Sequence, residues 1–553
     1  MSNHADPAPG AGYIGREVAF RFEEIGDLGP VPKEIPSPPK LVDKISKPNA
    51  VEKDLPFLTI GEASAKIRDG ELSSLDLTRA VLARIERLNP VLNSYITITS
   101  EFALKAAKEA DRDIQKGNYR GPLHGIPISL KDLVATSGIL TTGGTGALSD
   151  WVPNNDAVIW TKLREAGGIL VGKTNLHEMA AGSTNLNPFY GPARNPWDIL
   201  RITGGSSGGS GAAIAGHLCL GTIGSDTGGS IRMPASLCGT VGLKPTFGRV
   251  STQGALYLSW TNDHLGPLTK TVEDSALMMN VIAGYDPTNP LSANVADEDF
   301  ISSITKNIKG MRIAVPTDYF WELELRDQEN ATEVRLGPDP EIVKAVHVAL
   351  DVFRDLGASV TEVPLPGFKD LMRTSSIAAA ERGYYLDGLP EDRKKRFSQR
   401  YRDGNTRGLN SSSGSYLSNL HLGHQVQSIL EQALEKYDAF VLPSTPIVAP
   451  PIKAALAASN RADVFAMEDK TQDAPAVREI GPTSIIGRYT APFNRSGQPA
   501  LSLPCGFTSD GLPIGMMIVG KRFADASVLQ MGHAYQKVTD WHNRRPKNLD
   551  QVD

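Results

Sequence analysis

The sequence predicts an α/β protein built on one large mixed sheet, mostly of parallel type, with helices on both faces. Two observations predict this class. From residue 58 onward, short apolar segments of strand length alternate with segments of helical spacing. Such alternation pairs strands in parallel and lays helices over both faces of the sheet. The chain also has 553 residues, 40% of them hydrophobic and 22% charged, which is the composition of a globular protein with a large core.

The helix predictions depend on apolar positions three and four residues apart, combined with start and stop signals. A Ser-Ser-Leu-Asp start at 73–76 suits an N-cap, and Asp156 is expected to cap a helix that runs to Ala166 and stops at Gly167. The polar run 403–415 is predicted to be a loop. Helices are expected at 60–70, 74–89, 103–117, 156–166, 272–282, 339–356, 366–385, 415–436 and 525–539.

The strand predictions fall on short apolar runs bounded by glycine or proline. The run GIPISL ends immediately before Lys131, and a second run follows an apolar helical stretch that begins at Ala212. Strands are expected at 125–130, 169–172, 218–224, 311–315, 359–363, 440–443, 500–504 and 513–519.

The chain divides into two parts by composition. Residues 1–57 are rich in proline without sustained periodicity, which predicts an extended N-terminal arm. Residues 58–553 are predicted to form a single catalytic domain, with insertions that shape a pocket at about 320–485.

Charge and composition argue against several classes of partner. The 57 basic and 62 acidic residues give a net charge of −5 without a basic patch, so no nucleic acid is expected. No apolar run reaches membrane-spanning length, and the first residues lack a secretory signal. Three sparse cysteines, Cys219, Cys238 and Cys505, indicate buried thiols in a reducing compartment, so a cytoplasmic location is expected. No metal-binding spacing occurs, and no cofactor is predicted.

One stretch, from Gly204 to Pro234, indicates chemistry. It holds two glycine-framed serine clusters, with Ser206 in the first and Ser230 in the second, 24 residues later. A flexible linker would be polar throughout, whereas here the apolar run 212–220 joins the clusters. Glycines let backbone amides approach something small. The stretch therefore predicts a site in which serine is the working group.

A serine hydroxyl needs a base to become a nucleophile. Neither His124, His177 nor His217 is placed by a motif, and the G-x-S-x-G elbow of α/β-hydrolases is not recognisable. Lys131 follows a predicted buried strand, where burial would favour its neutral form. A structural salt bridge of Lys131 with Asp132 is the alternative, and the residues by themselves leave both open.

Five long blocks occur in a fixed order along the chain: GIPISLKD (125–132), GKTNLHEMAAGSTNLNPFYGPARNPWD (172–198), GGSSGGSGAA (204–213), GSDTGGSIRMPASLCGTVGLKPT (224–246) and FNRSGQPALSLPCG (493–506). Through these blocks, residues 57–310 resemble the amidase signature family, and 436–541 is similar to its C-terminal part. The N-terminal arm and residues 320–435 are covered less well.

The resemblance implies a Ser–cis-Ser–Lys triad. Ser230 would be the nucleophile, Ser206 the bridging serine after a cis peptide, and Lys131 the base, with Ser207 hydrogen bonding around the bridge. A hydroxyl both donates and accepts, so Ser206 is chemically suited to relay a proton between the other two.

The resemblance also implies a surrounding for the nucleophile. The oxyanion hole would consist of backbone amides that glycines leave unobstructed. Asp226 and Arg232 would support the loop through a charge-assisted contact rather than take part in catalysis. The expected amides belong to Thr227, Gly228, Gly229 and Ser230.

The substrate is the least determined part of the prediction. The glutaminase-subunit branch of the family has an acid before its Tyr-Thr-x-Pro segment, where this chain has Gly487 and Arg488. A stand-alone hydrolase of a small apolar or aryl amide is therefore expected, and the family resemblance implies a monomer or a homodimer. The alternatives are a carbamate, urethane or ester hydrolase, a glutaminase subunit of a tRNA-dependent amidotransferase, and a non-catalytic binding protein of this fold. The pocket residues, which could equally be core residues, are Met179, Ala180, Tyr257, Trp260 and Phe493.

Overall fold

The computed structural model describes residues 54–321, 323–326, 333–372, 377–460, 485–547 and 549. Most of the expected N-terminal arm lies outside this range, as does 461–484 of the expected insertions. At the start of the described chain, the Phe57 ring lies between the guanidinium groups of Arg84 and Arg545, at 4.7 and 4.0 Å from its centroid.

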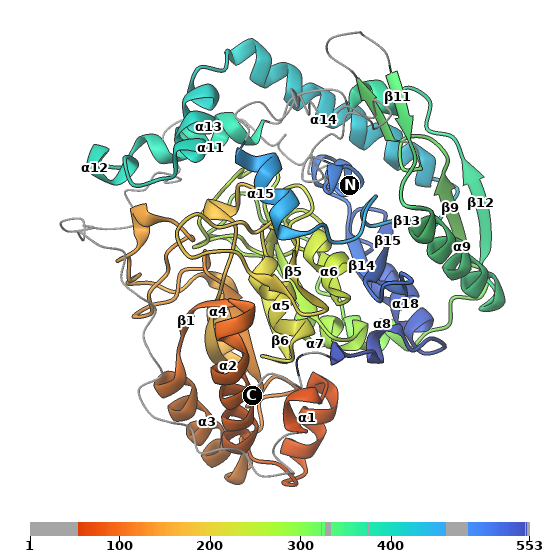
Figure 1. The fold of residues 1–553 in the computed structure, drawn as a ribbon. Helices are drawn as coiled ribbons and strands as arrows, with labels where there is room; N and C mark the ends of the chain where they lie inside the picture. Colours follow the sequence, from red (N-terminus) through yellow and green to blue (C-terminus); the bar gives the residue numbers. More distant parts are fainter. Residues whose placement is uncertain are drawn as a thin grey trace, which may run out of the picture.

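An eleven-stranded mixed sheet forms the centre of the molecule, which confirms the α/β class (Figure 1). Its order is β1-β3-β2-β6-β8-β7-β14-β15-β13-β9-β12. The strands are β1 (Tyr95–Ile98), β2 (Pro127–Lys131), β3 (Ile169–Thr174), β6 (Gly221–Asp226), β7 (Val241–Lys244), β8 (His264–Thr269), β9 (Arg312–Pro316), β12 (Ser359–Val363), β13 (Ala439–Pro443), β14 (Ala500–Phe507) and β15 (Pro513–Gly520). Two separate two-stranded sheets pair β4 (Arg194–Asn195) with β5 (Asp198–Ile202), and β10 (Leu323–Arg326) with β11 (Glu333–Leu336).

The expectation of mostly parallel pairing is wrong for the middle of the sheet. Parallel pairing occurs within β3-β2-β6 and within β13-β9-β12, whereas β8, β7, β14 and β15 between them pair antiparallel. Two of these strands, β7 and β8, were not expected from the sequence. Both are short and contain glycine, which weakens the strand signal.

Helices cover the sheet, and one of the two N-caps expected from the sequence is present. Ser73 accepts a hydrogen bond from the Asp76 N–H at 3.0 Å, as expected, whereas Asp156 pairs with Arg164 and leaves Ala157 as the N-cap of α4. The helices are α1 (Ile60–Arg68), α2 (Ser74–Leu92), α3 (Ser100–Gln115), α4 (Val158–Glu165), α5 (Gly208–Ala215), α6 (Arg232–Cys238), α7 (Val272–Ile282), α8 (Phe300–Ile304), α9 (Pro340–Asp355), α10 (Phe368–Leu371), α11 (Ala378–Asp387), α12 (Glu391–Lys394), α13 (Gln399–Leu409), α14 (Ser413–Leu434), α15 (Ile452–Asn460), α17 (Pro492–Arg495) and α18 (Asp525–Gln536).

The predicted loop at 403–415 is largely helical, which corrects the sequence interpretation. Residues 403–409 belong to α13, and α14 starts at Ser413. The glycines that suggested a loop instead allow close helix packing. A Cβ at Gly408 would lie 1.9 Å from the Ala379 carbonyl oxygen of α11. In Figure 1 the helices α11 to α14 gather at one end of the molecule, and α1 to α3 lie at the opposite end.

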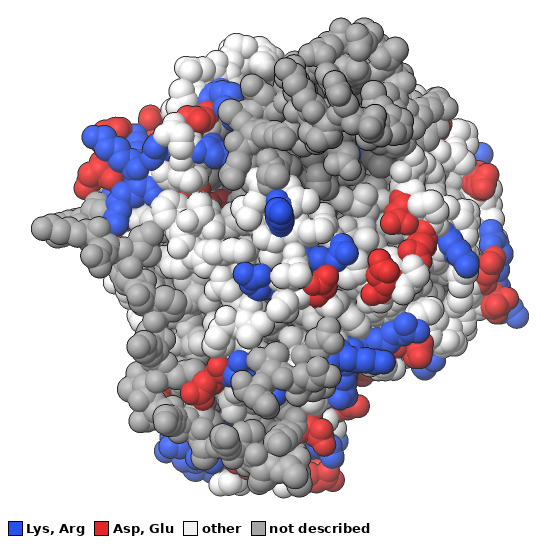
Figure 2. Space-filling view, in the orientation of Figure 1, with Lys and Arg blue, Asp and Glu red and all other residues white. Residues whose placement is uncertain are grey.

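The largest apolar cluster includes Cys219 and Cys505, and all three cysteines, with Cys238, are free, buried thiols. A second apolar cluster surrounds Phe320 and Phe493. Among the described residues, no helix is both long and apolar enough to cross a membrane. Figure 2 shows acidic and basic side chains interspersed on the face in view.

A pair of glycine substitutions tests the helical packing of this region. Gly408→Ala should lower the free energy of unfolding by about 1–3 kcal/mol, because the new methyl group forces α11 and α13 apart. Gly423→Ala on α14, where an added Cβ meets no atom within 4 Å, should raise it by about 0.5–1 kcal/mol. Thermal melting of both variants measures the difference, and equal melting temperatures would contradict the packing described.

Candidate active site

The two serine clusters occupy adjacent loops at one end of the parallel strands. Ser206 lies two residues before α5, and Ser230 lies two residues before α6. The Ser207 N–H donates to the Ser230 carbonyl oxygen at 3.2 Å, which joins the loops. Strand β2 ends at Lys131 and pairs in parallel with β6, so the lysine emerges beside the same loops.

Lys131 connects the strand end to the first serine cluster. Its side chain is fully buried, and its Nζ donates to the Ser206 Oγ and to the Ser225 Oγ, each at 2.7 Å. The Gly205–Ser206 peptide bond is cis. Ser225 was missed in the sequence interpretation, although it stands at the end of a predicted strand, within a block that matches the family.

The position of Lys131 favours its neutral form. Burial lowers the pKa of Lys131 from 10.5 to about 7, although the nearby carboxylates of Asp263 and Asp226 act in the opposite direction. The alternative partner, Asp132, accepts instead from Thr142, whose N–H lies 2.9 Å from its carboxylate. The surroundings of Lys131 therefore let its neutral form be populated near pH 7, because no salt bridge with Asp132 fixes it as a cation.

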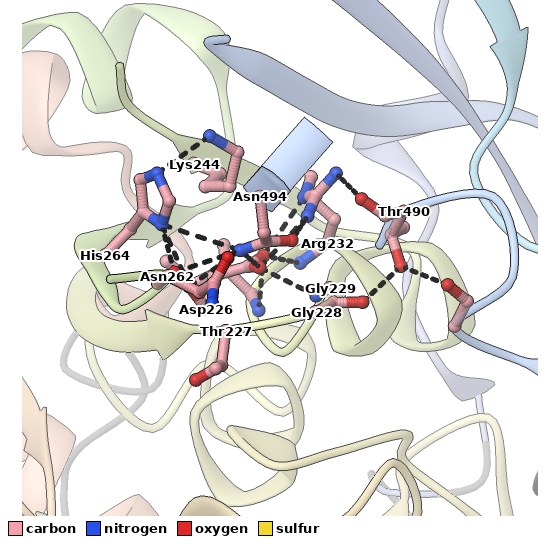
Figure 3. A network of polar contacts seen from close by, with 12 residues as sticks. Asp226, Thr227, Gly228, Gly229, Arg232, Lys244, Asn262, His264, Thr490 and Asn494 are labelled. Atoms are coloured by element: carbon pink, nitrogen blue, oxygen red, sulfur yellow. Dashed lines mark hydrogen bonds and ion pairs between the residues drawn. The ribbon is translucent and has the colours of Figure 1, made fainter. Parts of the chain in front are cut away.

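A buried ion pair organises the loop that carries Ser230 (Figure 3). Asp226 and Arg232 are both inaccessible to solvent, and two guanidinium nitrogens lie 3.0 Å from the two carboxylate oxygens. The same carboxylate accepts from the N–H groups of Gly229 and Ile231, at 2.7 and 3.1 Å. Burial would raise the pKa of Asp226, but the Arg232 charge outweighs it and holds the pKa well below its usual range.

This arrangement changes the expected set of oxyanion donors. The Gly229 N–H is engaged by Asp226, so it holds the loop and is not open to a substrate oxygen. A Cβ on Gly228 would meet no atom within 4 Å, so the loop faces open space there. At Gly229, φ is +127° and a Cβ would lie 2.0 Å from the Thr490 Oγ1, so only glycine fits.

Residues from the C-terminal part brace the same loop from the other side. Thr490 donates through its Oγ1 to the Gly228 carbonyl oxygen at 2.7 Å, and its own carbonyl accepts from Arg232. Asn494 on α17 donates to the Asp226 carbonyl at 2.9 Å and accepts from Arg232 at 2.7 Å. Neither residue was assigned a role from the sequence, although Asn494 falls in the matched block 493–506.

The expected pocket residues separate into two groups. Met179 is buried, and its sulfur would be only 2.6 Å from a Cβ at Gly143, so it packs inside the protein; Phe493 is fully buried and stacks on Phe320. These two are therefore core residues in the structure. Tyr257 and Trp260 contact tyrosines of α11, Tyr385 and Tyr384, with ring centroids 5.8 Å apart in both pairs.

The fifth expected pocket residue, Ala180, directly follows Met179 in an irregular turn. Both residues have positive φ, at 46° for Met179 and 61° for Ala180.

Among the described residues, no group of three His, Cys, Asp or Glu side chains is placed to hold a metal ion.

A buried lysine amine in contact with a serine hydroxyl at the end of a mixed sheet suits a hydrolase that uses a serine nucleophile, and the family match assigns it to hydrolases that act on amide C–N bonds. Residues 76–529 match the family profile described as Amidase. The chain therefore belongs to the amidase signature family.

Relatives with several activities resemble the chain over most of its length. It is 38% identical over 514 residues to a glutamyl-tRNA(Gln) amidotransferase subunit from Desulfatibacillum aliphaticivorans, covering 88% of this chain and 99% of the relative. Among solved structures, a 6-aminohexanoate cyclic dimer hydrolase has a TM-score of 0.75 at 28% identity, covering 89% and 99% of the two chains. A bacterial aryl acylamidase has a TM-score of 0.73 at 25% identity, covering 88% and 98%.

Removing one partner of the buried ion pair tests how much the pair contributes to the stability of the fold. Arg232→Gln leaves the Asp226 carboxylate buried without its countercharge, so the free energy of unfolding should fall by about 3–5 kcal/mol. Arg354→Gln removes an exposed pair with Asp351 and should change stability little. Urea unfolding followed by circular dichroism compares the two, and similar midpoints would contradict the role assigned to Arg232.

Proposed function

We propose that this protein is an amidase that hydrolyses a small amide through a seryl acyl-enzyme, with Ser230 as nucleophile, Ser206 as relay and Lys131 as base. The observation that supports this most is the 2.7 Å contact from the Lys131 Nζ to the Ser206 Oγ in a fully buried site. A cytoplasmic location and a monomeric or homodimeric state remain predictions from the sequence.

The proposed reaction begins with neutral Lys131. Because its pKa is about 7, about half of the lysines are neutral at that pH and can accept a proton. Lys131 takes the Ser206 proton while Ser206 takes the Ser230 proton, and the Ser230 Oγ attacks the amide carbon. Ser225 accepts a Lys131 N–H and thereby leaves the lone pair of the neutral amine to face the Ser206 hydroxyl, 2.7 Å away.

The negative charge that develops on the carbonyl oxygen needs hydrogen-bond donors. We assign this role to the backbone amides of Thr227, Gly228 and Ser230, without that of Gly229, which donates to Asp226. Each such donor contributes about 3–4 kcal/mol to stabilising the transition state. The Ser206 hydroxyl then returns a proton to the leaving amine, and water hydrolyses the acyl-enzyme through the same relay in reverse.

A small apolar or aryl amide is the proposed substrate, and the solved cyclic-dimer hydrolase and aryl acylamidase support this range. A carbamate, urethane or ester is a chemical neighbour that the same acyl transfer would accept. The second candidate, a glutaminase subunit, is favoured by the 38% identity to the glutamyl-tRNA(Gln) amidotransferase relative. Against it, Gly487 and Arg488 replace the expected acid, and the Arg488 guanidinium lies 4.2 Å from the centroid of the Tyr319 ring.

Ser230→Ala should abolish hydrolysis, with kcat/KM falling at least about a thousandfold, because no other hydroxyl would form the acyl-enzyme. A fluorophosphonate probe should label the unmodified enzyme and the surface variant Ser411→Ala, but not Ser230→Ala. A panel of alkyl amides, anilides, glutamine and carbamates should show faster turnover of amides and anilides than of glutamine. Labelling of the Ser230→Ala variant would refute the assignment of Ser230 as nucleophile. Preferential turnover of glutamine would favour the glutaminase function over the amidase proposed here.

The pH dependence should report the neutral lysine. Since only unprotonated Lys131 accepts a proton, kcat/KM should rise about tenfold per pH unit below pH 7 and level off above it. Lys131→Met should remove both the activity and this inflection. His177 cannot produce it, because burial lowers the pKa of that imidazole to about 3. A flat profile from pH 5 to 9, or an active Lys131→Met variant, would contradict the assignment.

A further inference from the structure

A pocket of about 430 Å³ opens between α13 and the segment that follows β3. Three arginines line it: Arg382 from α11, and Arg400 and Arg407 from α13. His177 and Glu178 line it from the other side, and much of the remaining wall is apolar. This pocket was not anticipated from the sequence, because its arginines lie in the region that the family resemblance covers least.

The pocket adjoins the proposed triad. The backbone N–H of His177 donates to the Ser206 carbonyl oxygen at 3.0 Å. Burial first, and then the charges of Arg400 and Lys131, lower the pKa of His177, so this imidazole is near both the pocket arginine and the base. This wall of the pocket is therefore joined through the His177 backbone to the loop of Ser206, whereas the side chains of the proposed triad are not among the lining residues.

The pocket carries three arginines against one carboxylate, that of Glu178, whose pKa is raised by burial while the charge of Arg382 acts in the opposite direction. Among the described residues, no carboxylate lies within 4.0 Å of the guanidinium nitrogens of Arg382, Arg400 or Arg407. Glu178, the acid in the wall, is occupied by the Ser398 N–H and the Thr145 hydroxyl, both at 3.0 Å, and by the Ser398 hydroxyl. The Arg382 Nε is buried without a hydrogen-bond acceptor.

The helices hold these charges together. Arg400, Gly404 and Arg407 recur four and then three residues apart, so they share one face of α13. A Cβ on Gly404 would lie 2.3 Å from the Arg382 Nη2, so glycine makes room for that guanidinium. The Arg382 guanidinium also lies 4.6 Å from the centroid of the Tyr401 ring. Burial and then the charge of Arg407 lower the pKa of Arg400. An anion bound between the two arginines would reduce the repulsion between their charges.

We propose that this pocket binds a carboxylate of the substrate, so that the enzyme prefers small amides carrying a carboxylate on an apolar chain. This inference rests on the proposed function. Guanidinium groups bind carboxylates in a bidentate manner, and the apolar wall suits the chain that joins carboxylate and amide. Glutamine also carries a carboxylate, but the α-ammonium group on the same carbon would be repelled by the same three arginines and would offset much of that attraction, so glutamine should be a poorer substrate.

The test compares two substrates that differ only by the carboxylate, hexanamide and adipamate, the monoamide of adipic acid. The unmodified enzyme should have a KM for adipamate at least about tenfold lower than for hexanamide. Arg400→Gln, and more strongly Arg400→Gln with Arg407→Gln, should raise the KM for adipamate by about tenfold or more. The KM for hexanamide should stay within about twofold in both variants, because it leaves the pocket charge unused.

Arg402→Gln is the matched control on the same helix. Its guanidinium donates to the carbonyl groups of Lys395 and Phe397 and does not line the pocket. Both substrates should behave in this variant as they do in the unmodified enzyme. An equal KM for the two substrates in the unmodified enzyme, or equal losses for both in the arginine variants, would overturn the carboxylate site while leaving the amidase proposal intact.

A binding experiment separates this inference from the proposed function. Adipate should bind to the Ser230→Ala protein by calorimetry and should bind at least about tenfold more weakly when Arg400→Gln and Arg407→Gln are added. If neither amide is hydrolysed and the fluorophosphonate probe does not label Ser230, the amidase proposal fails. In that case adipate binding that depends on the arginines would still support an anion site, and absence of binding would overturn it.

Discussion

The nucleophile loop depends on the buried ion pair of Asp226 and Arg232. Two charges removed from water are costly to bury, and they are tolerated only where their hydrogen-bonding groups are satisfied. Here the carboxylate accepts from two loop amides as well as from the guanidinium, and the guanidinium reaches Thr490 and Asn494. One interaction therefore joins β6, α6 and the segment around α17 into a single support for Ser230.

The same charges tune the lysine. Complete burial by itself would push the pKa of Lys131 further down, and the carboxylates of Asp226 and Asp263 oppose this. The balance leaves the pKa at about 7, where both protonation states are populated. In the proposed mechanism this lysine, whose pKa is lowered by its position in the fold, takes the part of a histidine base near neutral pH.

The helices at one end of the molecule are linked to this loop as well as to the pocket. Glu381 of α11 is buried and accepts from Thr261 at 2.7 Å and from the Tyr416 hydroxyl at 2.9 Å. Two residues after Thr261, in the segment that leads into β8, Asp263 accepts from the Thr227 hydroxyl at 2.5 Å. The region that is least familiar in sequence is therefore linked through residues 261–263 to the proposed oxyanion loop, and it also lines the arginine pocket.

The sequence by itself predicted the chemistry proposed for the centre, because its glycine and serine clusters and the lysine after a buried strand are local patterns with few structural uses. It also determined the α/β class through the alternation of apolar segments. Only the tertiary structure decided the antiparallel middle of the sheet, the helical state of 403–409 and the engagement of Gly229. It also brought Arg232 to Thr490 and Arg400 to the neighbourhood of His177. Each of these depends on partners far away along the chain, and short-range periodicity carries no information about such partners.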